Sequence, residues 1–305
     1  MQKLFNIQGG FPMPITLIAS DMDGTLLKDR DSISQFSAET IKSIQKQGIS
    51  FVACTGRTLA QARGPLNEQG ISCPIIALNG AQIYDENNQL LHQSTIPKEI
   101  GRELIKEIES SLCFVELITD KGIYMRTREA RIESFKSYFK FSNQHIPHEQ
   151  LLDSLKDLEQ TFGLEYEADF DTLLDQEDLN LLKLSVFPQH SIAVLKALQR
   201  DLASRFSMVS VTSSGIGNIE INSKEGQKGA ALTYFAKKFG HDLENTLTIG
   251  DNLNDISMLK VSGHSYAMAN GAKETKIAAQ FLAKSNKEDG VAYAILDALS
   301  RIENT

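Results

Sequence analysis

Short apolar runs alternate with amphipathic segments through residues 14–84, and this alternation predicts strands joined by helices. Three of the runs have the length and composition of buried strands. They are residues 15–20, 49–54 and 74–78. Between them we expect a helix that is capped by Ser37 and stops at Gly48, and a second helix over about residues 58–68. This βαβαβ order predicts a parallel sheet.

The pattern changes over residues 93–215. A helix with one apolar stripe is expected over residues 97–110. After it come a strand over 113–119, its hairpin partner over 123–126, and further helix and strand patterns that include 179–187 and 206–212. The hairpin, the charges and the aromatic residues predict an α+β unit with a small core of its own.

From about residue 216 the alternation of helix and strand returns. The expected helices are 228–239, 254–260 and 290–302, and the expected strands are 246–250, 265–269 and 281–283. We therefore expect an α/β protein whose Rossmann-like parallel sheet is interrupted by an inserted α+β domain. The expected division is an N-terminal extension at residues 1–12, a core made of 13–92 and 216–305, and an insert at 93–215.

The composition is that of a globular protein and argues against two classes of partner. The chain has 305 residues, of which 41% are hydrophobic and 23% charged, and its formal net charge is -8. A chain of this length is expected to form about two domains. The negative charge argues against nucleic acid and against an anionic membrane as partners, but a small phosphorylated metabolite needs only a few local cations.

The cysteines and the apolar runs bear on location. Three widely spaced cysteines include no CxxC pair, so a zinc site or a redox motif is not expected. An odd and sparse number of cysteines suits a reducing compartment, and the expected location is cytoplasmic. No apolar run approaches the ~20 residues that a membrane-spanning helix needs. No secretory signal is expected ahead of Asp21.

The most informative polar residues directly follow the first expected strand. Asp21 and Asp23 stand two residues apart where that strand ends, and Gly24 permits a turn. Ligands of open α/β sheets bind beyond the carboxyl ends of the strands. The acidic pair is therefore expected to hold a cation, to supply a nucleophile, or to do both. An EF-hand calcium loop does not fit, because Leu26 and Ser32 occupy the positions of its glycine and its final glutamate.

Three other loops have the same placement, and neighbouring parallel strands would bring all four loops to one crevice. These loops contain Thr55-Gly56, Lys228, and the segment from Gly250 to Asp255. Their carboxylates, hydroxyl, ammonium and amide groups suit a phosphoryl group with Mg²⁺, which prefers carboxylate, water and phosphate oxygens. Phosphoryl transfer depends mainly on positioning and charge neutralisation, so this set of groups is close to sufficient.

A purely structural role would explain Asp255 at its position but not Lys228. Lys228 opens an expected helix, where a cation opposes the helix dipole, so an anionic group is expected nearby. Asp255 lies in a first helical turn, where the dipole favours a carboxylate without any function. Asp251 follows Gly250 at the end of a strand and is the better candidate for a metal ligand.

With these motifs the chain resembles the haloacid dehalogenase (HAD) superfamily of aspartate-nucleophile phosphatases, and specifically its Cof-type, class IIb branch. Four motifs occur in the order of that family, namely Asp21-Met22-Asp23-Gly24-Thr25-Leu26-Leu27, Thr55-Gly56-Arg57, Lys228-Gly229 and Gly250-Asp251-Asn252-Leu253-Asn254-Asp255. The long insert matches the α+β cap domain of this branch. The third motif is preceded by a second lysine, Lys224, but the family pattern of Lys followed by Gly selects Lys228.

The resemblance implies a Mg²⁺-dependent phosphatase that works through an aspartyl phosphate. Asp21 would attack phosphorus, and Asp23 would protonate the leaving oxygen and then activate water. Mg²⁺ would be bound by the Asp21 carboxylate, the Asp23 backbone carbonyl and Asp251, with help from Asn252. The implied phosphate-binding groups are the Met22 backbone N–H, Thr55, Gly56, Lys228 and Asn254.

The expected substrate is a small phosphate monoester, such as a sugar phosphate or a phosphorylated cofactor. Two other functions stay open from the sequence. One is a phosphotransferase or mutase on the same scaffold, which transfers phosphate to a second hydroxyl instead of to water. The other is a protein that senses a phosphoryl group without turnover, against which the intact acidic pair, Lys228 and Asp251 argue.

Overall fold

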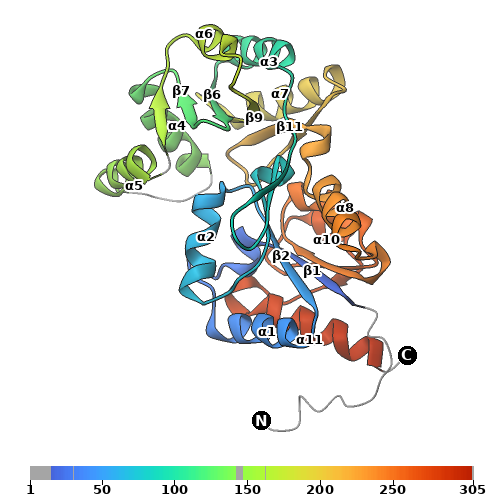
Figure 1. Cartoon of the computed structure of the whole chain (residues 1–305). Helices are drawn as coiled ribbons and strands as arrows, with labels where there is room; N and C mark the ends of the chain where they lie inside the picture. The colour runs from blue at the N-terminus through green and yellow to red at the C-terminus, as the bar shows by residue number, and fades with distance from the viewer. Residues whose placement is uncertain (1–14, 30, 142–146, 162, 304–305) are drawn as a thin grey trace.

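Two β-sheets, arranged one above the other along the long axis of the molecule, organise the chain (Figure 1). This computed structural model describes residues 15–29, 31–141, 147–161 and 163–303. The expected extension at residues 1–12 lies outside the described residues. Within the described ranges, no helix is both long and apolar enough to cross a membrane.

The larger sheet has eight strands in the order β14-β13-β12-β1-β2-β3-β4-β5. Neighbouring strands are parallel from β14 to β3, and β4 and β5 add an antiparallel edge. The strands are β1 (Leu17–Asp21), β2 (Ser50–Cys54), β3 (Ile75–Ala77), β4 (Gln82–Tyr84), β5 (Leu90–Gln93), β12 (Thr246–Gly250), β13 (His264–Ala267) and β14 (Phe281–Leu282). The predicted α/β fold with a parallel, Rossmann-like core is confirmed.

Helices cover both faces of the larger sheet, which explains why its central strands β1 and β12 are buried along their whole length. One face packs against α1 (Gln35–Lys46), α2 (Leu59–Glu68) and α11 (Gly290–Glu303), and the other against α8 (Lys228–Phe239) and α9 (Ile256–Val261). The short helix α10 (Lys273–Ala278) connects β13 and β14. With both faces covered in this way, a ligand is expected to reach the sheet at the ends of its parallel strands.

The smaller sheet has six strands in the order β10-β11-β9-β6-β7-β8, which are antiparallel except for β7 and β8. They are β6 (Cys113–Thr119), β7 (Ile123–Met125), β8 (Leu164–Tyr166), β9 (Leu181–Pro188), β10 (Val209–Thr212) and β11 (Ile219–Ser223). One face packs against α3 (Lys98–Ser110), α6 (Phe170–Asp175) and α7 (Ile192–Arg205), and the other against α4 (Arg128–Phe141) and α5 (His148–Thr161).

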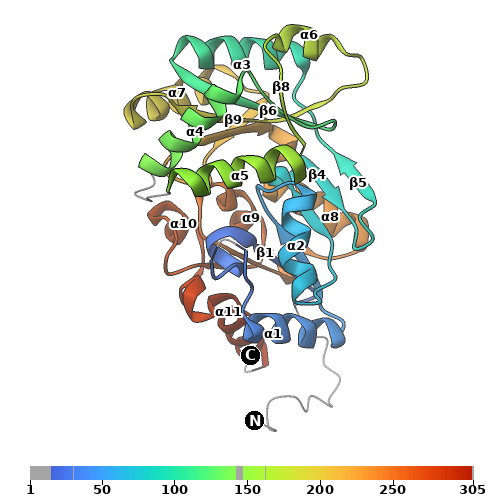
Figure 2. The same ribbon diagram turned by 90° about the vertical axis from the view of Figure 1, so that its left-hand side faces the viewer.

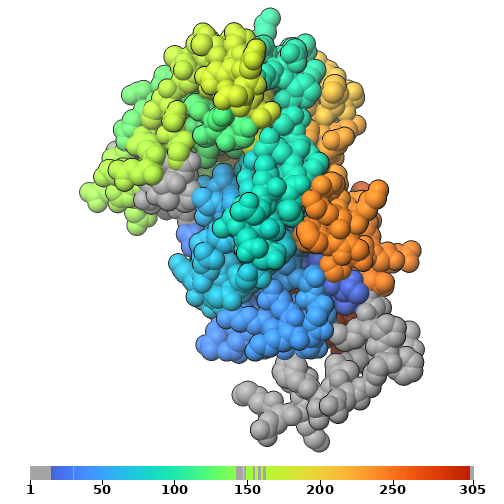
Figure 3. Space-filling view, viewed as in Figure 1, coloured from blue at the N-terminus to red at the C-terminus, as the bar shows by residue number. Residues whose placement is uncertain are grey.

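The smaller sheet lies over the carboxyl ends of the parallel strands. Figure 2 shows α3 and α6 at the outer end of the molecule, with α4 and α5 on the side that faces the larger sheet. The teal part of the chain, which includes β5 and α3, passes from one sheet to the other (Figure 3). The polar loops at the strand ends are therefore enclosed between the two sheets.

Two details differ from the sequence predictions. The first helix is capped by Ser34, whose Oγ accepts a hydrogen bond from the Ser37 backbone N–H at 3.1 Å, whereas the predicted cap Ser37 is buried inside the helix. An N-cap side chain accepts a hydrogen bond from the backbone N–H about two or three residues later in the chain. This spacing alone does not distinguish Ser34 from Ser37 as the cap. The parallel pattern was predicted to return at residue 216, but β11 pairs with β9 and β10 in the smaller sheet. The sequence of a four- or five-residue strand does not reveal which strands it pairs with.

Candidate active site

A cavity of about 290 Å³ lies between the carboxyl ends of the parallel strands and the smaller sheet. It is lined from below by loops that follow β1, β2 and β12, and from the other side by Tyr138 of α4 and Glu220 of β11. The predicted site residues that line it are Asp21, Asp23, Gly56, Asp251, Asn252 and Asn254. The predicted convergence of loops on one crevice thus appears in the structure.

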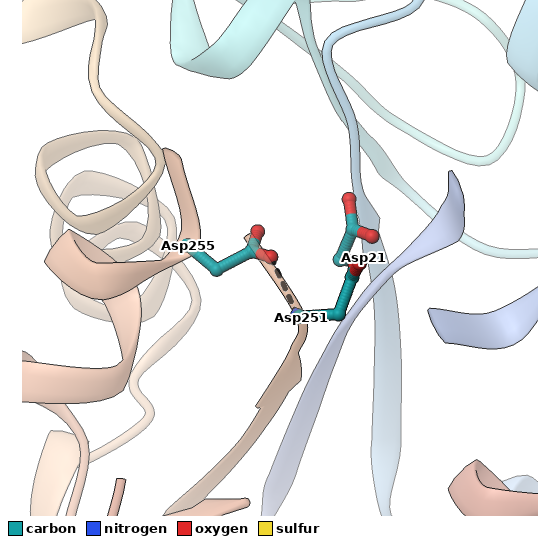
Figure 4. Close-up of side chains that lie close together, drawn as sticks. All are labelled: Asp21, Asp251 and Asp255. Carbon is teal, nitrogen blue, oxygen red and sulfur yellow. Dashed lines mark hydrogen bonds between the residues drawn. The ribbon is translucent and has the colours of Figure 1, made fainter. Parts of the chain in front are cut away.

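Three buried carboxylates converge at one end of this cavity (Figure 4). Asp21 is the last residue of β1, Asp251 directly follows β12, and Asp255 ends the short helical turn after it. One carboxylate oxygen of each lies within 4.8 Å of the others. Figure 4 shows Asp21 and Asp251 on adjacent strands, with Asp255 reaching toward them from the neighbouring turn. Parallel pairing of β1 with β12 is what brings residues so far apart in sequence together.

Lys228 supplies a positive charge to this cluster. Its Nζ lies 2.5 Å from Asp21 Oδ1 and 2.6 Å from Asp255 Oδ1, and its side chain is fully buried. Burial alone would lower the pKa of the ammonium, but the two carboxylates raise that pKa above its ordinary value. A cation at the start of α8 opposes the helix dipole. The anionic partner that the sequence predicted for Lys228 is therefore this pair of carboxylates.

Asp255 is held in place by the backbone. Its Oδ2 accepts hydrogen bonds from the N–H groups of Asp251 at 2.8 Å and of Asn252 at 2.9 Å, while its Oδ1 accepts from Lys228. A Cβ on Gly250 would come within 2.5 Å of the Asp255 Cβ, so only glycine fits at the end of β12. Asp255 thus fixes both the loop that carries Asp251 and the ammonium that faces Asp21.

The turn after β1 packs directly against the carboxylate of Asp251. Gly24 has a φ of +76°, and a Cβ there would lie 2.5 Å from Asp251 Oδ2. The neighbouring Thr25 donates its hydroxyl proton to Asp251 Oδ1 at 2.9 Å. Gly24 therefore serves two purposes, since it adopts a left-handed conformation and lets the Asp251 carboxylate come close.

Asp23 belongs to the same cavity but has a different environment. Its side chain is 54% exposed, and Arg57 holds it with two nitrogens, Nη2 at 2.6 Å from Oδ1 and Nε at 2.9 Å from Oδ2. Arg57 Nη1 also lies 3.1 Å from Asp31 Oδ1. A bidentate guanidinium fixes the orientation of a carboxylate. Asp21 and Asp23, two residues apart, thus differ in burial and in the cation that each contacts.

The charges of the buried cluster fit a divalent cation. Three carboxylates share one ammonium, so the cluster carries an excess of negative charge when all are ionised. Burial, followed by repulsion from Asp255, raises the pKa of Asp21 well above its ordinary range and that of Asp251 to about 7. Buried carboxylates with raised pKa values are stabilised by a metal ion, and oxygen ligands suit Mg²⁺. Asp21 and Asp251 are the members that also line the cavity.

This charge excess predicts a pH dependence of stability. Without divalent metal, the free energy of unfolding should fall as the pH rises from about 4 to about 7, because folded Asp251 keeps a proton that it releases on unfolding. Mg²⁺ should raise Tm by ~5 °C at pH 8, where it replaces that proton, and by much less at pH 5. Differential scanning fluorimetry at both pH values tests this. In the Asp251→Asn variant the Mg²⁺ response should be weak at both pH values, and an equal Mg²⁺ shift at pH 5 and pH 8 in the wild type would contradict the prediction.

The loop after β2 contributes backbone and hydroxyl groups. Gly56 and Arg57 line the cavity, whereas Thr55 is fully buried and its Oγ1 accepts a hydrogen bond from the Arg57 N–H at 3.1 Å. Asn254 donates from Nδ2 to Asn79 Oδ1 at 3.1 Å. Asn79 lies in the turn after β3 with a φ of +62°. These contacts order polar groups around the cavity that come from the loops after β2, β3 and β12.

The remaining predicted site residues have these positions. The Met22 side chain is buried in the core of the larger sheet, and its backbone belongs to the turn after β1. The Asn252 side chain caps the turn of Asp255 through Oδ1, and its Nδ2 donates to Ser214 O at 2.8 Å. Lys224, the second lysine before α8, is exposed.

Several residues of the site had no predicted role. Arg57 and Thr25 stand inside the motifs, and their spacing from Asp23 and Asp251 gives no sign of contact. Glu220 and its partner Lys183 are the single charged residues of two fully buried strands, and a charge within such a strand was the available signal. Which loop such residues face depends on the pairing of β9 and β11, which the sequence does not reveal.

Comparison with known proteins places this geometry in a family. The family model of the haloacid dehalogenase-like hydrolases matches residues 18–295. The 5-amino-6-(5-phospho-D-ribitylamino)uracil phosphatase YwtE of Bacillus subtilis (strain 168) is 32% identical over 284 residues, which cover 93% of this chain and 98% of that protein. Phosphatase YwpJ of the same organism is 30% identical over 282 residues, which cover 91% and 97%.

A solved structure agrees with these sequence matches. The structure of a haloacid dehalogenase-like hydrolase from B. subtilis aligns with a TM-score of 0.79 at 28% identity. The alignment covers 93% of this chain and 99% of that one. The likeness therefore extends over both sheets and is not restricted to the parallel core.

Proposed function

The chain belongs to the haloacid dehalogenase-like hydrolases and is a phosphatase of small phosphorylated substrates, and we propose that it requires Mg²⁺ and works through an aspartyl phosphate on Asp21. The observation that carries the proposal is the position of Asp21. This carboxylate ends the central strand, lines the cavity, and contacts a fully buried ammonium at 2.5 Å. A nucleophile fixed next to a buried cation suits attack on a phosphate dianion.

In the first step, an oxygen of the Asp21 carboxylate forms a bond to phosphorus while the bond from phosphorus to the substrate oxygen breaks. Asp23 gives a proton to that leaving oxygen. Arg57 holds the Asp23 carboxyl group through two nitrogens at the wall of the cavity, which fixes its position relative to the leaving group. The products of this step are an alcohol and the phosphoryl group on Asp21.

In the second step, water attacks the phosphoryl group and its proton passes to Asp23. The bond between phosphorus and the Asp21 oxygen breaks, which releases inorganic phosphate and restores both carboxyl groups. Lys228 faces Asp21 throughout, so the negative charge that builds up on the phosphoryl oxygens is close to a fixed cation. One exposed and one buried carboxylate can divide the roles of acid–base and nucleophile in this way.

Mg²⁺ would be held by the carboxylates of Asp21 and Asp251 and by the backbone carbonyl of Asp23, with Asn252 nearby. When bound, the ion supplies positive charge that lowers the repulsion between the nucleophile and the phosphoryl oxygens. The backbone N–H of Met22, the loop of Thr55 and Gly56, Lys228 and Asn254 are proposed to hold those oxygens.

The two sheets are proposed to form two domains, a hydrolase core and a cap. The cap would begin after β5 at about residue 93 and would reach Ser223 at the end of β11, because β11 pairs in the smaller sheet. Tyr138, Ser214 and Glu220 of the cap face the carboxylates across the cavity. This arrangement supports a division in which the core performs the chemistry and the cap contacts the leaving group.

The proposed substrates are sugar phosphates or phosphorylated cofactors. A cavity of about 290 Å³ admits a small monoester rather than a phosphorylated macromolecule. The relative YwtE is named for a uracil that carries a phosphorylated ribityl chain, which is a monoester of this size class. The three buried free thiols of Cys54, Cys73 and Cys113 support a location in the cytoplasm.

A panel of small phosphate monoesters tests the proposal. With Mg²⁺ the purified protein should release inorganic phosphate from sugar phosphates or phosphorylated cofactors, and EDTA should abolish release until Mg²⁺ is restored. Transfer of the phosphoryl group to an added hydroxyl compound in place of water would favour a phosphotransferase. Undiminished turnover in EDTA would contradict the metal requirement, and no turnover of any ester would favour a phosphoryl-sensing protein.

A further inference from the structure

Two buried opposite charges lie on the cap sheet where it faces the core. Lys183 of β9 is 3% exposed and Glu220 of β11 is 4% exposed, and they form an ion pair. Burial opposes ionisation of Glu220, but the ammonium of Lys183 and the amide of Asn79 lower the pKa of its carboxyl group. Glu220 is therefore a carboxylate, which accepts hydrogen bonds and donates none.

Both members of the pair contact loops of the core. Lys183 Nζ donates to the Gly56 carbonyl at 3.2 Å, and Glu220 Oε2 accepts from Asn79 Nδ2 at 2.9 Å. The neighbouring Asn222 donates from Nδ2 to the Leu78 carbonyl at 3.0 Å. The loops after β2 and β3 are thus bound to the cap sheet by three side chains.

These contacts determine how the side-chain amides of Asn79 and Asn254 are oriented. Because the Glu220 carboxylate only accepts, the Asn79 amide must turn its nitrogen toward Glu220 and its oxygen toward Asn254. The Asn254 amide must then turn its nitrogen toward Asn79. One of the two N–H bonds of that nitrogen is used by Asn79, and the other stays available as a donor on this wall of the cavity. With a neutral amide in place of Glu220, the orientation of Asn79 would depend on the longer hydrogen bond from its Nδ2 to Asn222 Oδ1 at 3.3 Å.

The peptide group between Gly56 and Arg57 is fixed in the same way. Its carbonyl accepts from Lys183, and its N–H donates to Thr55 Oγ1. The Asn79 N–H in turn donates to the Thr55 carbonyl at 2.8 Å. The two core loops, Lys183 and Glu220 form one connected network of hydrogen bonds. Such networks fix which atom of each group donates and which accepts.

We propose that Glu220, held by Lys183, is a positioning residue for phosphate binding, so that the cap sheet forms part of the phosphate site and not only its cover. This inference rests on the proposed function, since it takes Gly56 and Asn254 as phosphate-binding groups. Glu220 acts on the phosphoryl oxygens through Asn79 and Asn254, and Lys183 acts through the carbonyl of Gly56.

The cap contains a matched pair that lacks these contacts. Arg131 and Glu116 form a second buried ion pair, 5% and 7% exposed, between α4 and β6. Glu116 and Glu220 are both opposite Ser185 in the sheet register, so the two carboxylates lie on the same face of the same sheet. The contacts described for the Arg131 side chain are all within the cap, with Glu116, Met125 and the rings of Phe135 and Phe187.

The test compares Glu220→Gln with Glu116→Gln by the inhibition constant of inorganic phosphate, measured with saturating Mg²⁺. Both changes replace a buried paired carboxylate by an amide of the same size, so both should lower Tm. Only Glu220→Gln should weaken phosphate inhibition, by about tenfold, because hydrogen bonds to charged groups are worth that much and the Asn79 amide loses its shorter, charged acceptor. Glu116→Gln should change the constant by less than about twofold.

Two double variants keep the test possible if the single variants do not fold. Lys183→Met with Glu220→Leu removes both charges, as does Arg131→Met with Glu116→Leu, and neither leaves an unpaired buried ion. The first double variant should again lose at least about tenfold in phosphate affinity, and the second should not. Equal inhibition constants for both pairs, in a wild type that is inhibited by phosphate, would overturn the positioning role. A wild type that neither hydrolyses monoesters nor binds phosphate would instead overturn the proposed function and this inference with it.

Discussion

The Asp23→Asn variant, given an activated aryl phosphate, should accumulate a phosphoryl group on Asp21. An aryl leaving group needs little protonation, so transfer to Asp21 continues slowly without the acid. Attack by water then lacks its base, which costs typically ~10²–10⁴-fold in rate. A burst of aryl alcohol followed by slow turnover is expected. Borohydride reduces an acyl phosphate to an alcohol, so mass spectrometry should find homoserine in place of Asp21.

Two variants serve as controls for this result. Asp21→Asn should give neither burst nor reduction product, because an amide oxygen is a poor nucleophile. Asp31→Asn removes the other carboxylate that contacts Arg57, and since Asp31 is 66% exposed it should change turnover by less than about threefold. Near-normal turnover by Asp21→Asn, or a modified residue other than Asp21, would contradict the aspartyl-phosphate mechanism itself.

Most of the parallel core follows from local sequence signals. The predicted helix over residues 228–239 and the predicted strand over 246–250 have the bounds found for α8 and β12. Gly240 follows α8 in a left-handed conformation with a φ of +74°, which is common for glycine at the end of a helix. Continuous apolar runs identify strands covered on both faces, and parallel neighbours are implied by the helices between them.

The convergence of the four loops was predictable for the same reason. Residues at the carboxyl ends of parallel neighbours must meet at one edge of the sheet, so Asp21 and Asp251 were expected to be close, and the structure brings them together with Lys228. The role of Asp255 was harder to foresee. One of its oxygens accepts from the backbone N–H groups of the loop, and the other contacts Lys228, so this carboxylate holds both the loop and the ammonium that faces Asp21.

The network between the cap and the core was not predictable from local patterns. Lys183 and Glu220 are 37 positions apart, and their meeting depends on the pairing of β9 with β11. Their contact with Gly56 and Asn79 depends further on how the cap sheet is placed over the core. Neither apolar periodicity nor turn signals carry this information, because both describe a segment relative to its own sheet.

Replacement of Lys228 by methionine should nearly abolish activity and also destabilise the fold. Three buried carboxylates would then face one another without an ammonium, and the loss of one partner of a buried ion pair costs about 3–5 kcal/mol. The group that faces the developing charge on phosphorus would also be missing, a loss of at least ~10²–10³-fold in kcat/KM. Turnover of an aryl phosphate and Tm measure the two effects.

Lys224→Met is the matched control, because this lysine is four positions earlier in the chain, has the same side chain, and is exposed. It should leave kcat/KM within about twofold of the wild type. If Lys228→Met does not fold, the double variant Lys228→Met with Asp255→Asn removes one carboxylate along with the ammonium and should recover much of the stability. Activity should stay low in that variant, because the cation next to Asp21 is still absent. Recovery of activity together with stability in the double variant would show that Lys228 only holds the buried carboxylates together and takes no part in the chemistry. A large loss in Lys224→Met would show that the lysine needed for activity is Lys224.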